Sequence, residues 1–549
     1  MTRATPLPLA PDRPSPLAHR LRPRPLAWLL ALAWLGHTAV AVAQPTKPVA
    51  LAGSFALVQD GKQLQVNTTN AAGTLHSAIQ WDSFNIPAGT VVWFKQPSVQ
   101  STSINRVNSA SPSSILGGLA SNGHLVLVNP AGIVVGADAV VDTARFTAAA
   151  MQLSDDNARS GRLLFEGGSQ LAVQGHIVAR DGDVLLLAPK VQVDSTATVQ
   201  ALQGAVMLAA GQTIEVTSPG LTGLRFEIQA PADQAVNLGL LQGHAVGLFA
   251  SQLRHSGQID VRAVQTEGGK ILIQAQGQAV VGGKLDTPEH ADMHIQANTL
   301  DIQGTVNAGK QGQISIELHA GEAVPAWHQA PNATLSADRI HLAGPSKTAQ
   351  NPTQPDATLY QVNARELSFG QWNSVLLAGE TVFDQLSFPG GQVSTTDSAL
   401  LVPGGRDRVA QATVDVGNMH VAAGTGLVVD FNGSQHDQII FSATTGVRVN
   451  DPVNITWNTP KPIPAGRYVL ALQAPDTALI TNDRPQPPLS PEAQQQVRSE
   501  NVLQTLMTLY AQAATEVAAQ ADTAVVQTPA ERREREAPAL VAQSGDACP

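Results

Sequence analysis

Short apolar segments separated by small turns recur through the middle of the chain. Each unit has Gly or Thr before a strand, then a small turn with Gly, a second strand and another turn. Ile177 and Val199 occupy equivalent positions 22 residues apart, and a period near 20 residues is typical of one coil of a parallel β-helix. We therefore expect an all-β chain that forms a right-handed parallel β-helix (β-solenoid), in which each coil buries its inward face against its neighbours. The four clearest units begin at Gly175, Ala197, Gly257 and Gly304.

The apolar residues within a unit alternate in a way that predicts where they point. In the run DVLLLA, Val184 and Leu186 alternate with Leu185 and Leu187. Successive side chains of a strand point to opposite faces, so we expect one pair in the core and the other pair against a neighbouring layer. A β-sandwich or barrel would also have short strands and Gly turns, but those folds rarely repeat at one fixed period, which favours the solenoid.

Turn residues punctuate the units. Gly204, Gly269 and Gly312 lie between paired strands, where we expect corners with a positive φ angle that glycine adopts at low cost. Asn and Gln recur at matching outward or corner positions, and we expect their amides to stack along the axis. Between residues 317 and 360 the repeat lapses, which predicts a long insertion from one corner, with RIHLA as its one segment of strand character.

The composition supports this fold class. The 549 residues include 46 Gly and 36 Pro, only 4% aromatic and 14% charged residues, and 43% apolar residues. That apolar share can build a sizeable core, while abundant turn formers and few aromatics are typical of many short strands.

The first residues have the form of an export signal. Five arginines precede the apolar run 26–35, and small residues at Ala41 and Ala43 follow, as at a signal-peptidase site. The run is too short for a membrane anchor, the alternative, which needs about 20 apolar residues. We expect residues 1–43 to be a removed signal peptide.

Charge and cysteine content narrow the partners. Residues 1–43 hold five of the 33 basic and one of the 43 acidic residues, which leaves 28 against 42 and a net charge of −14. Nucleic acid is therefore not an expected partner. Cys548 is the single cysteine, so no intramolecular disulfide can form and stability must come from packing. Cys548 is either a tether to a partner through an intermolecular disulfide or an incidental residue of the tail.

The stretch from Trp81 to Met151 carries the most specific motifs. It contains, in order, SFNI, NRV, S-I-x-G, Asn-Gly before an apolar run, and NP-x-GI. From Val49 to Met151 the chain resembles the N-terminal secretion domain of filamentous-haemagglutinin-like exoproteins of two-partner secretion systems. The family usually has Asn where this chain has Ala131, which removes one polar side chain from that corner.

The resemblance implies a partner and a set of motif residues. The partner is a dedicated outer-membrane β-barrel transporter with periplasmic recognition domains, and the secretion domain supplies capping strands for the first coil. Asn129 and Pro130 end a strand, and Gly132 permits a tight corner. Asn105 and Arg106 either cap the first coil or face the secretion partner. The secretion-motif residues are Asn105, Arg106, Val107, Asn129, Pro130, Gly132 and Ile133.

Beyond the repeats, VVDF, HDQIIF and AGRYVLAL are expected to be strands of closing coils. Ser490 as N-cap and Pro491 at the first helical position predict an amphipathic helix. This helix either covers the last coil or pairs with another chain, and a disordered tail follows. Its apolar face holds Val502, Leu506, Leu509, Ala513 and Val517. The expected organisation is 1–43 signal peptide, 44–155 secretion domain, 156–316 repeats, 317–360 insertion, 361–480 closing coils, and 481–549 helix and tail.

Candidate chemistry is sparse. Ser434, His436 and Asp437 are the residue types of a hydrolytic triad, but such triads assemble from distant segments. There is no phosphate-binding glycine loop and no HExxH. We expect no enzyme activity, no metal and no cofactor. One acidic stretch has donors spaced as metal ligands can be, although the spacing favours a solvated acidic loop: Glu289, His290, Asp292 and His294.

The expected function is that of an adhesin-like exoprotein of a Gram-negative bacterium. It would pass through the periplasm, be secreted or displayed on the cell surface, and bind a receptor on host cells, matrix or other bacteria. One alternative is a β-helix with enzymatic or cytolytic activity. Another is a haem or ligand carrier that uses histidines of the expected insertion, namely His319, His328 and His341.

Overall fold

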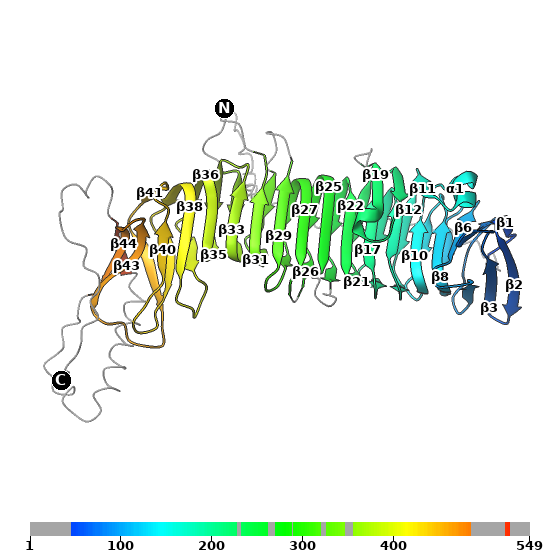
Figure 1. Cartoon of the computed structure of the whole chain (residues 1–549), viewed down its shortest axis with the longest axis horizontal. Helices are drawn as coiled ribbons and strands as arrows, with labels where there is room; N and C mark the ends of the chain where they lie inside the picture. Colours follow the sequence, from blue (N-terminus) through cyan, green and yellow to red (C-terminus); the bar gives the residue numbers. More distant parts are fainter. Residues whose placement is uncertain are drawn as a thin grey trace, which may run out of the picture. The chain divides into compact units, whose positions relative to one another are not determined.

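The protein is a parallel β-helix. The computed structural model describes residues 45–227, 232–261, 269–287, 289–319, 326–345, 355–484 and 522–526, which stack coil upon coil along one axis (Figure 1). Ile177 pairs with Val199 in parallel register, so the 22-residue repeat does mark one coil. The coils supply three parallel sheets, which we name A, B and C.

Sheet A runs through the whole stack. Its inward residues form an apolar column in which Ile177, Val199 and Leu241 are fully buried neighbours in register. In chain order its strands are β3 (Gln63–Thr69), β5 (Val91–Lys95), the first parts of β8 (Gly118–Val128) and β10 (Val140–Ala149), β13 (His176–Ala179), β16 (Thr198–Ala201), β21 (Leu240–Gly243), β24 (Gln258–Val261), β26 (Lys284–Asp286), β28 (Thr305–Asn307), the first parts of β31 (Thr334–Ala343) and β33 (Gln361–Gly370), β35 (Glu380–Phe383), β37 (Leu400–Pro403), β39 (Gly426–Asp430) and β42 (Val453–Asn458).

Sheets B and C complete each coil, and several long strands bend from one sheet into the next. Sheet B consists of β4 (His76–Trp81), β6 (Thr102–Val107), the second parts of β8, β10, β31 and β33, β14 (Val184–Ala188), β17 (Ala205–Ala210), β22 (Ala245–Ala250), the first parts of β25 (Lys270–Val281), β27 (Asp292–Ile302), β36 (Gln385–Thr395) and β38 (Gln411–Val421), β29 (Gln313–Leu318), β40 (Gln438–Phe441) and β43 (Gly466–Gln473). Sheet C consists of β7 (Ser113–Ile115), β9 (Ile133–Val135), β12 (Gln170–Val173), β15 (Lys190–Val193), β20 (Gln234–Asn237), β23 (Gln252–His255), the second parts of β25, β27, β36 and β38, β30 (Trp327–Gln329), β32 (Ala357–Leu359), β34 (Ser374–Leu377) and β41 (Gly446–Val449).

Antiparallel strands close both ends of sheets A and B. At the first coil, β2 (Ser54–Asp60) pairs antiparallel with β3, and β1 (Val49–Ala52) pairs antiparallel with β4. At the last coil, β44 (Thr477–Arg484) pairs antiparallel with β43, and β45 (Asp522–Val526) does so with β42 and β44. The capping strands expected at the N-terminal end are therefore present, and antiparallel strands at both ends prevent sheets A and B from exposing a parallel edge.

Polar side chains link neighbouring coils on the outside. Gln274 donates to Gln296 at 2.8 Å, and Gln296 donates to Glu317 at 3.3 Å, so the expected stacking of amides occurs. Such ladders repeat because equivalent residues of successive coils lie one strand spacing apart.

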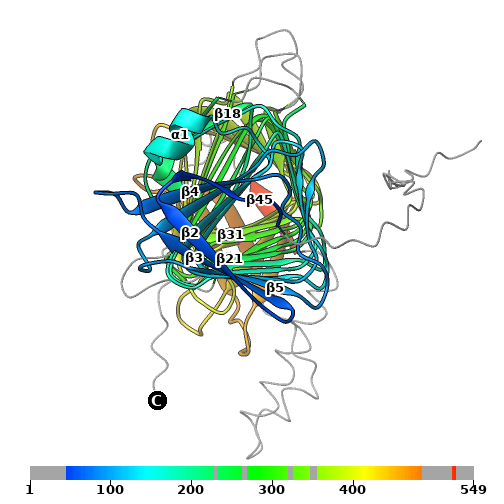
Figure 2. The same cartoon turned by 90° about the vertical axis from the view of Figure 1, so that its right-hand side faces the viewer.

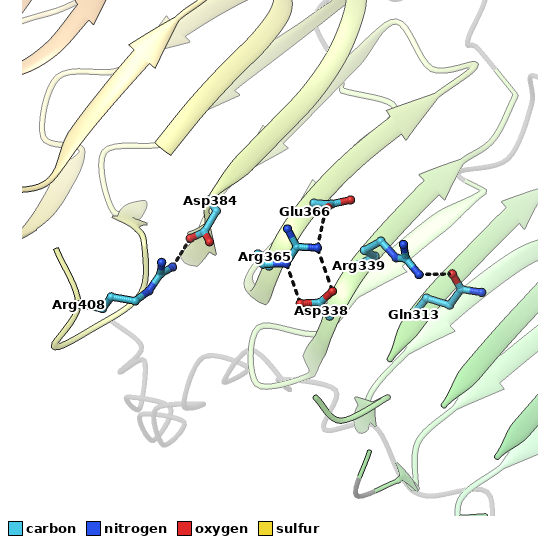
Figure 3. Close-up of polar contacts among 7 residues, drawn as sticks. All are labelled: Gln313, Asp338, Arg339, Arg365, Glu366, Asp384 and Arg408. Carbon is cyan, nitrogen blue, oxygen red and sulfur yellow. Dashed lines mark hydrogen bonds and ion pairs between the residues drawn. The ribbon is translucent and has the colours of Figure 1, made fainter. Parts of the chain in front are cut away.

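Charged ladders follow the corner between sheets A and B in the later coils (Figure 3). Arg365 lies one coil beyond Asp338 and binds it through two nitrogens at 2.8 and 3.1 Å. The neighbouring coils add an ion pair between Arg408 and Asp384. The bond from Arg365 lowers the pKa of the Asp338 carboxyl. These exposed pairs each contribute little to stability, and they join equivalent corners of successive coils.

The glycines at the expected corners are explained by close backbone approaches and not by the positive φ angles that were expected. Gly204, Gly269 and Gly312 are not among the residues with positive φ. Instead, a Cβ on Gly312 would lie 1.9 Å from the carbonyl oxygen of Ala308, and one on Gly204 would lie 2.4 Å from the carbonyl carbon of Gly182. Glycine is required at these two positions because backbones approach closely.

The described part of the interval 317–360 consists of coil strands and is not one long insertion, which corrects the expectation. It contains β30, β32 and all of β31, whose second part is the RIHLA segment. These strands pair in parallel with the coils before and after them. The described residues of this interval, 317–319, 326–345 and 355–360, therefore belong to the coils of the helix.

Three expectations at the termini concern residues that the structure does not describe. They are the signal peptide 1–43, the amphipathic helix after Ser490 and the tether at Cys548. The expected strands VVDF, HDQIIF and AGRYVLAL correspond to β39, β40 and β43. One correction applies to 481–549, because β44 extends to Arg484 and β45 lies at 522–526, where only a helix and a tail were expected. In the described part of the chain, no helix has the length and hydropathy that crossing a membrane requires.

Candidate functional site

Asn105 lies inside the first coils of the stack. It is fully buried on β6, between Ile79 and Leu127 of the neighbouring strands of sheet B. Its Oδ1 accepts a 3.0 Å hydrogen bond from the indole Nε1 of Trp81, and its Nδ2 donates to the carbonyl and hydroxyl oxygens of Ser103 at 3.1 Å. A buried amide needs such partners to offset its desolvation. Asn105 therefore orients Trp81.

Aromatic rings fill the core beside Asn105. Trp81 meets Phe84 edge to face at 5.6 Å between ring centroids, and Phe84 stacks on Phe94 at 6.2 Å. All three rings are buried. Asn105 and Arg106 were expected either to cap the first coil or to face the secretion partner. The Asn105 side chain points into this closed end, which is the position of a residue that caps the first coil.

Arg106 and Val107 have separate surroundings. Val107 is buried in the interior of the helix. Arg106 points outward and forms an ion pair with Asp155 in the first turn of α1 (Asp155–Ser160). The helix is also attached by Arg159, whose Nη1 donates to the carbonyl oxygen of Leu51 at 2.8 Å. Arg106 thus fastens α1 across the first coils.

The Asn129-Pro130-Ala131-Gly132-Ile133 motif is a coil corner, as expected. Asn129 is fully buried, and its Nδ2 donates to Ser111 O and Ser113 Oγ at 3.1 and 3.0 Å. Its Oδ1 accepts the backbone N–H of Ala131 at 3.0 Å. Gly132 has φ +129, which favours glycine, and Ile133 then enters β9 fully buried. The corner joins sheet B to sheet C and binds the preceding loop.

A second layer covers the outside of sheet B over these coils (Figure 2). It consists of α1 and a three-stranded antiparallel sheet of β11 (Leu163–Glu166), β18 (Thr213–Val216) and β19 (Leu224–Glu227), with the short turn η1 (Leu221–Gly223) between the last two. We call this the cover layer. Its core is separate from the interior of the helix: Leu185 and Leu187 face it, whereas Val184 and Leu186 face inward.

The cover layer confirms the neighbouring layer expected from DVLLLA. The segments that form the cover layer were not predicted from the sequence. The unbroken apolar run AVMLAA of β17 is a signal for this layer. All six of its residues are buried, and a strand that is buried on both faces needs a packing partner on each face.

The candidate triad does not assemble. Asp437 accepts backbone N–H groups of Ala410 at 2.6 Å and Asp430 at 2.7 Å, and burial raises its pKa to about 7. The His436 ring lies 3.1 Å from the carbonyl oxygen of Val469, and Ser434 is exposed and donates to Asn432 at 3.3 Å. The three side chains therefore serve three different local contacts.

The acidic stretch does not form a metal site either. Asp292 accepts a 3.0 Å hydrogen bond from Gln313 of the next coil, and Glu289 lies opposite Lys310. Among the residues that the structure describes, no three His, Cys, Asp or Glu side chains are placed to hold a metal ion; this covers Glu289, His290, Asp292 and His294.

Comparisons with known proteins find a similar curated protein and a similar solved structure. The chain is 27% identical over 223 residues to the heme/hemopexin-binding protein of Haemophilus influenzae, a match that covers 36% of this chain and 24% of the relative. The chain thus matches about a quarter of that relative's length. Among solved structures, the HMW1 secretion domain from Haemophilus influenzae matches with a TM-score of 0.43 and 19% identity, over 75% of this chain and 99% of that one.

The family match includes the coils described above. A sequence model of the TPS secretion domain matches residues 41–316, which is half of the chain. This range contains the closed first coils, the corner at Asn129 and the cover layer. The chain therefore belongs to the TPS secretion domain family, the secretion domains of two-partner exoproteins.

Proposed function

We propose that this chain is an exoprotein that a two-partner outer-membrane β-barrel transporter exports through the periplasm. We propose further that it acts outside the cell, released or held at the surface, as an adhesin-like rod. The observation that supports export is the secretion-domain match over residues 41–316, together with an end whose antiparallel strands allow stacking to proceed in one direction.

The adhesin part of the proposal rests on the repetitive outer surface. Ladders of Gln, Asp and Arg side chains link successive coils, as at Gln274 with Gln296 and at Asp338 with Arg365. A repeated polar surface suits many weak contacts with a receptor on host cells, matrix or other bacteria, and such contacts combine into useful avidity. A role without enzyme activity is the simplest one compatible with Ser434, His436 and Asp437 making separate contacts.

Export is tested by expressing the chain with and without its cognate transporter in a Gram-negative host. We expect the mature protein in the medium or on the cell surface only when the transporter is present. Deletion of residues 81–151 should leave the protein in the periplasm, whereas Asn363→Ala, an exposed change on β33, should be exported normally. Normal secretion of the deletion variant would contradict the proposal.

The adhesin role is tested by adding purified mature protein to host cells, matrix components and bacteria. We expect saturable binding to at least one of these surfaces and competition with intact producing cells. Binding that is absent from all of them would remove the adhesin part while leaving export intact.

A haem or ligand carrier is the second candidate, because one relative is named a heme/hemopexin-binding protein. The three suspected histidines do not meet. His328 is on sheet C with Nδ1 2.6 Å from Asp301, His341 is on sheet B with Nδ1 2.9 Å from Ser368, and His319 follows β29. A carrier would therefore use at most one of them as an axial ligand. An absorption titration of the purified protein with haem tests this, and a spectrum equal to that of free haem would exclude it.

A further inference from the structure

The last strand of sheet C has one unpaired side in the described part of the chain. β41 pairs with β38, and no described strand lies on its other side. The last strands of sheets A and B differ, because β45 pairs with β42 and β44 pairs with β43. β41, β43 and β44 lie at the same end of the helix (Figure 1). An open strand edge is a template for a further strand.

Two residues of β41 direct their backbone groups to the open side. The N–H of Asn450, just after the strand, donates to the carbonyl oxygen of Val421 on β38 at 2.9 Å. Alternate residues of a parallel strand bond to the same neighbour, so Arg448 also faces β38, while Val447 and Val449 face away from it. The open side therefore offers the N–H and C=O groups of Val447 and Val449.

The strands of sheet C share one pattern of side chains. In the four-residue strands β12, β15, β20, β23 and β34 the second and fourth residues are buried and the third is not. In β41 the same two positions hold Val447 and Val449, but Val447 is only half-buried, and Arg448 between them is exposed. A further strand with this pattern would bury more of Val447 as well as pair the backbone.

One segment near the end of the chain has this pattern. Beyond β45, the longest apolar run is 539–542, with the sequence ALVA. Its second and fourth residues are Leu540 and Ala542, and Pro538 and Gly545 flank it as turn residues flank a strand. We call residues 539–542 the ALVA segment. Its length and its apolar positions match those of a sheet C strand.

The described structure brings this segment to the end of the helix that carries β41. β45 runs antiparallel to β42, and Ala524 lies opposite Val453, the residue at which β42 begins. β42 begins just after the corner at which β41 ends, so β45 runs toward the side of the helix that sheet C occupies. Residues 527–538, which join β45 to the ALVA segment, can extend over about 40 Å. The segment can therefore reach β41 of the same molecule.

We propose that the ALVA segment pairs with β41 and closes sheet C. Leu540 and Ala542 lie beside the two inward valines of β41, and the backbone groups of the open side gain partners. Val541 lies opposite Arg448 on the outer face. All three sheets then end on a strand supplied by the residues after β43. This pairing is independent of the proposed export and adhesin functions.

A disulfide tests the pairing in the full mature chain. Arg448→Cys and Val541→Cys are introduced together with Cys548→Ser, and the control variant has Glu534→Cys, in the charged run before the ALVA segment, in place of Val541→Cys. Facing residues of antiparallel strands have Cα atoms about 4.5–5.5 Å apart, a separation that a disulfide spans. We expect the first variant to form an intramolecular disulfide at least tenfold faster than the control, as followed by mass spectrometry of the linked peptides. Equal rates would overturn the proposal.

Amide hydrogen exchange separates the inward from the outward position of the segment. Leu540→Asp places a charge on the inward side, and Val541→Asp places the same charge one residue away on the outward side. We expect the amides of Val447 and Val449 to exchange at least tenfold faster in Leu540→Asp than in the wild type. Val541→Asp should match the wild type, and the amides of β38 should stay protected in both variants, which establishes that the helix is folded.

Two results would count against the ALVA segment as the occupant. Unchanged exchange of Val447 and Val449 in Leu540→Asp would show that the segment does not pair with β41. If Arg448→Cys with Cys548→Ser forms disulfide-linked dimers, the occupant of the open side is a second copy of the chain and the proposal is wrong.

Discussion

The indole Nε1 of Trp81 donates a 3.0 Å hydrogen bond to Oδ1 of Asn105, with both side chains fully buried. The two residues are 24 positions apart, about one coil, so a motif asparagine holds an aromatic ring of the preceding coil. This hydrogen bond connects the segment with the most specific motifs, Trp81 to Met151, to the aromatic packing that fills the first coils.

Asn105→Leu is expected to destabilise the first coils. It removes the acceptor of Trp81 and leaves a buried N–H without a partner, which costs about 1–3 kcal/mol. Urea unfolding followed by Trp fluorescence measures the change. Asn363→Ala, at an exposed position, is the control and should stay within about 0.5 kcal/mol of the wild type. An equal loss in both variants would contradict the role given to Asn105.

Arg106 and Asp155 are expected to couple weakly but specifically. Their side chains are 21% and 55% exposed, so the pair should contribute no more than about 1 kcal/mol. A double-mutant cycle with Arg106→Gln and Asp155→Asn measures it, with hydrogen exchange of the α1 amides as readout. Strict additivity of the two changes would show that the ion pair does not fasten α1.

Leu187→Ala should loosen the cover layer before the helix itself. Leu187 is buried in the core beneath the cover layer, and truncation of a buried leucine costs about 2–5 kcal/mol. We expect amides of β11 and β18 to lose protection from hydrogen exchange before those of β14. Leu186→Ala, one position away but facing the interior, is the matched comparison and should expose β14 together with its neighbours. The same order of exposure in both variants would contradict the existence of two cores.

Acid is expected to destabilise the helix through His255. This histidine is fully buried on β23, its Nδ1 lies 3.0 Å from Nδ2 of Asn237, and burial lowers its pKa to about 4. The unfolded chain binds a proton near pH 6.5, whereas the folded chain does not until about pH 4. The contribution of neutral His255 to the free energy of unfolding is therefore complete above about pH 6.5. It is lost as the pH falls toward 4, and the total loss is about 3 kcal/mol.

Unfolding free energies measured between pH 7 and 4 check this. His255→Asn should flatten the pH dependence, while Asn363→Ala, an exposed change on β33 that alters no titratable group, should leave it unchanged. His124 contributes in the same direction, because burial and then Arg145 lower its pKa to about 3, so some slope should remain in the His255 variant. An undiminished slope in that variant would refute the assignment to His255.

Much of this fold follows from the period of its apolar residues. The 22-residue spacing of Ile177 and Val199 is the register of β13 on β16, and the two-residue alternation in DVLLLA separates the two cores. The interval 317–360 was misjudged because its coils are longer. Val306 pairs with Leu335 and Leu335 with Val362, spacings of 29 and 27 residues, so a search at a fixed period loses them although the strands persist.

Only part of the candidate functional site could be predicted from the sequence. Alternation along β6 places Asn105 and Val107 on one side and Arg106 on the other, but hydropathy alone would turn the asparagine outward. Its inward position depends on Trp81, whose contact with it requires the coils to be stacked. The cover layer depends in the same way on β11 and β18, which are 47 residues apart and pair only after the coils between them have formed.

The antiparallel strands at both ends also determine how molecules of this protein behave together. A parallel stack with open ends would accept strands of another molecule and elongate into fibrils, as cross-β assemblies do. Here β1 and β2 reverse the chain direction at one end, and β44 and β45 reverse it at the other. On sheets A and B, a neighbouring molecule therefore finds no in-register parallel template, which opposes end-to-end growth through these two sheets.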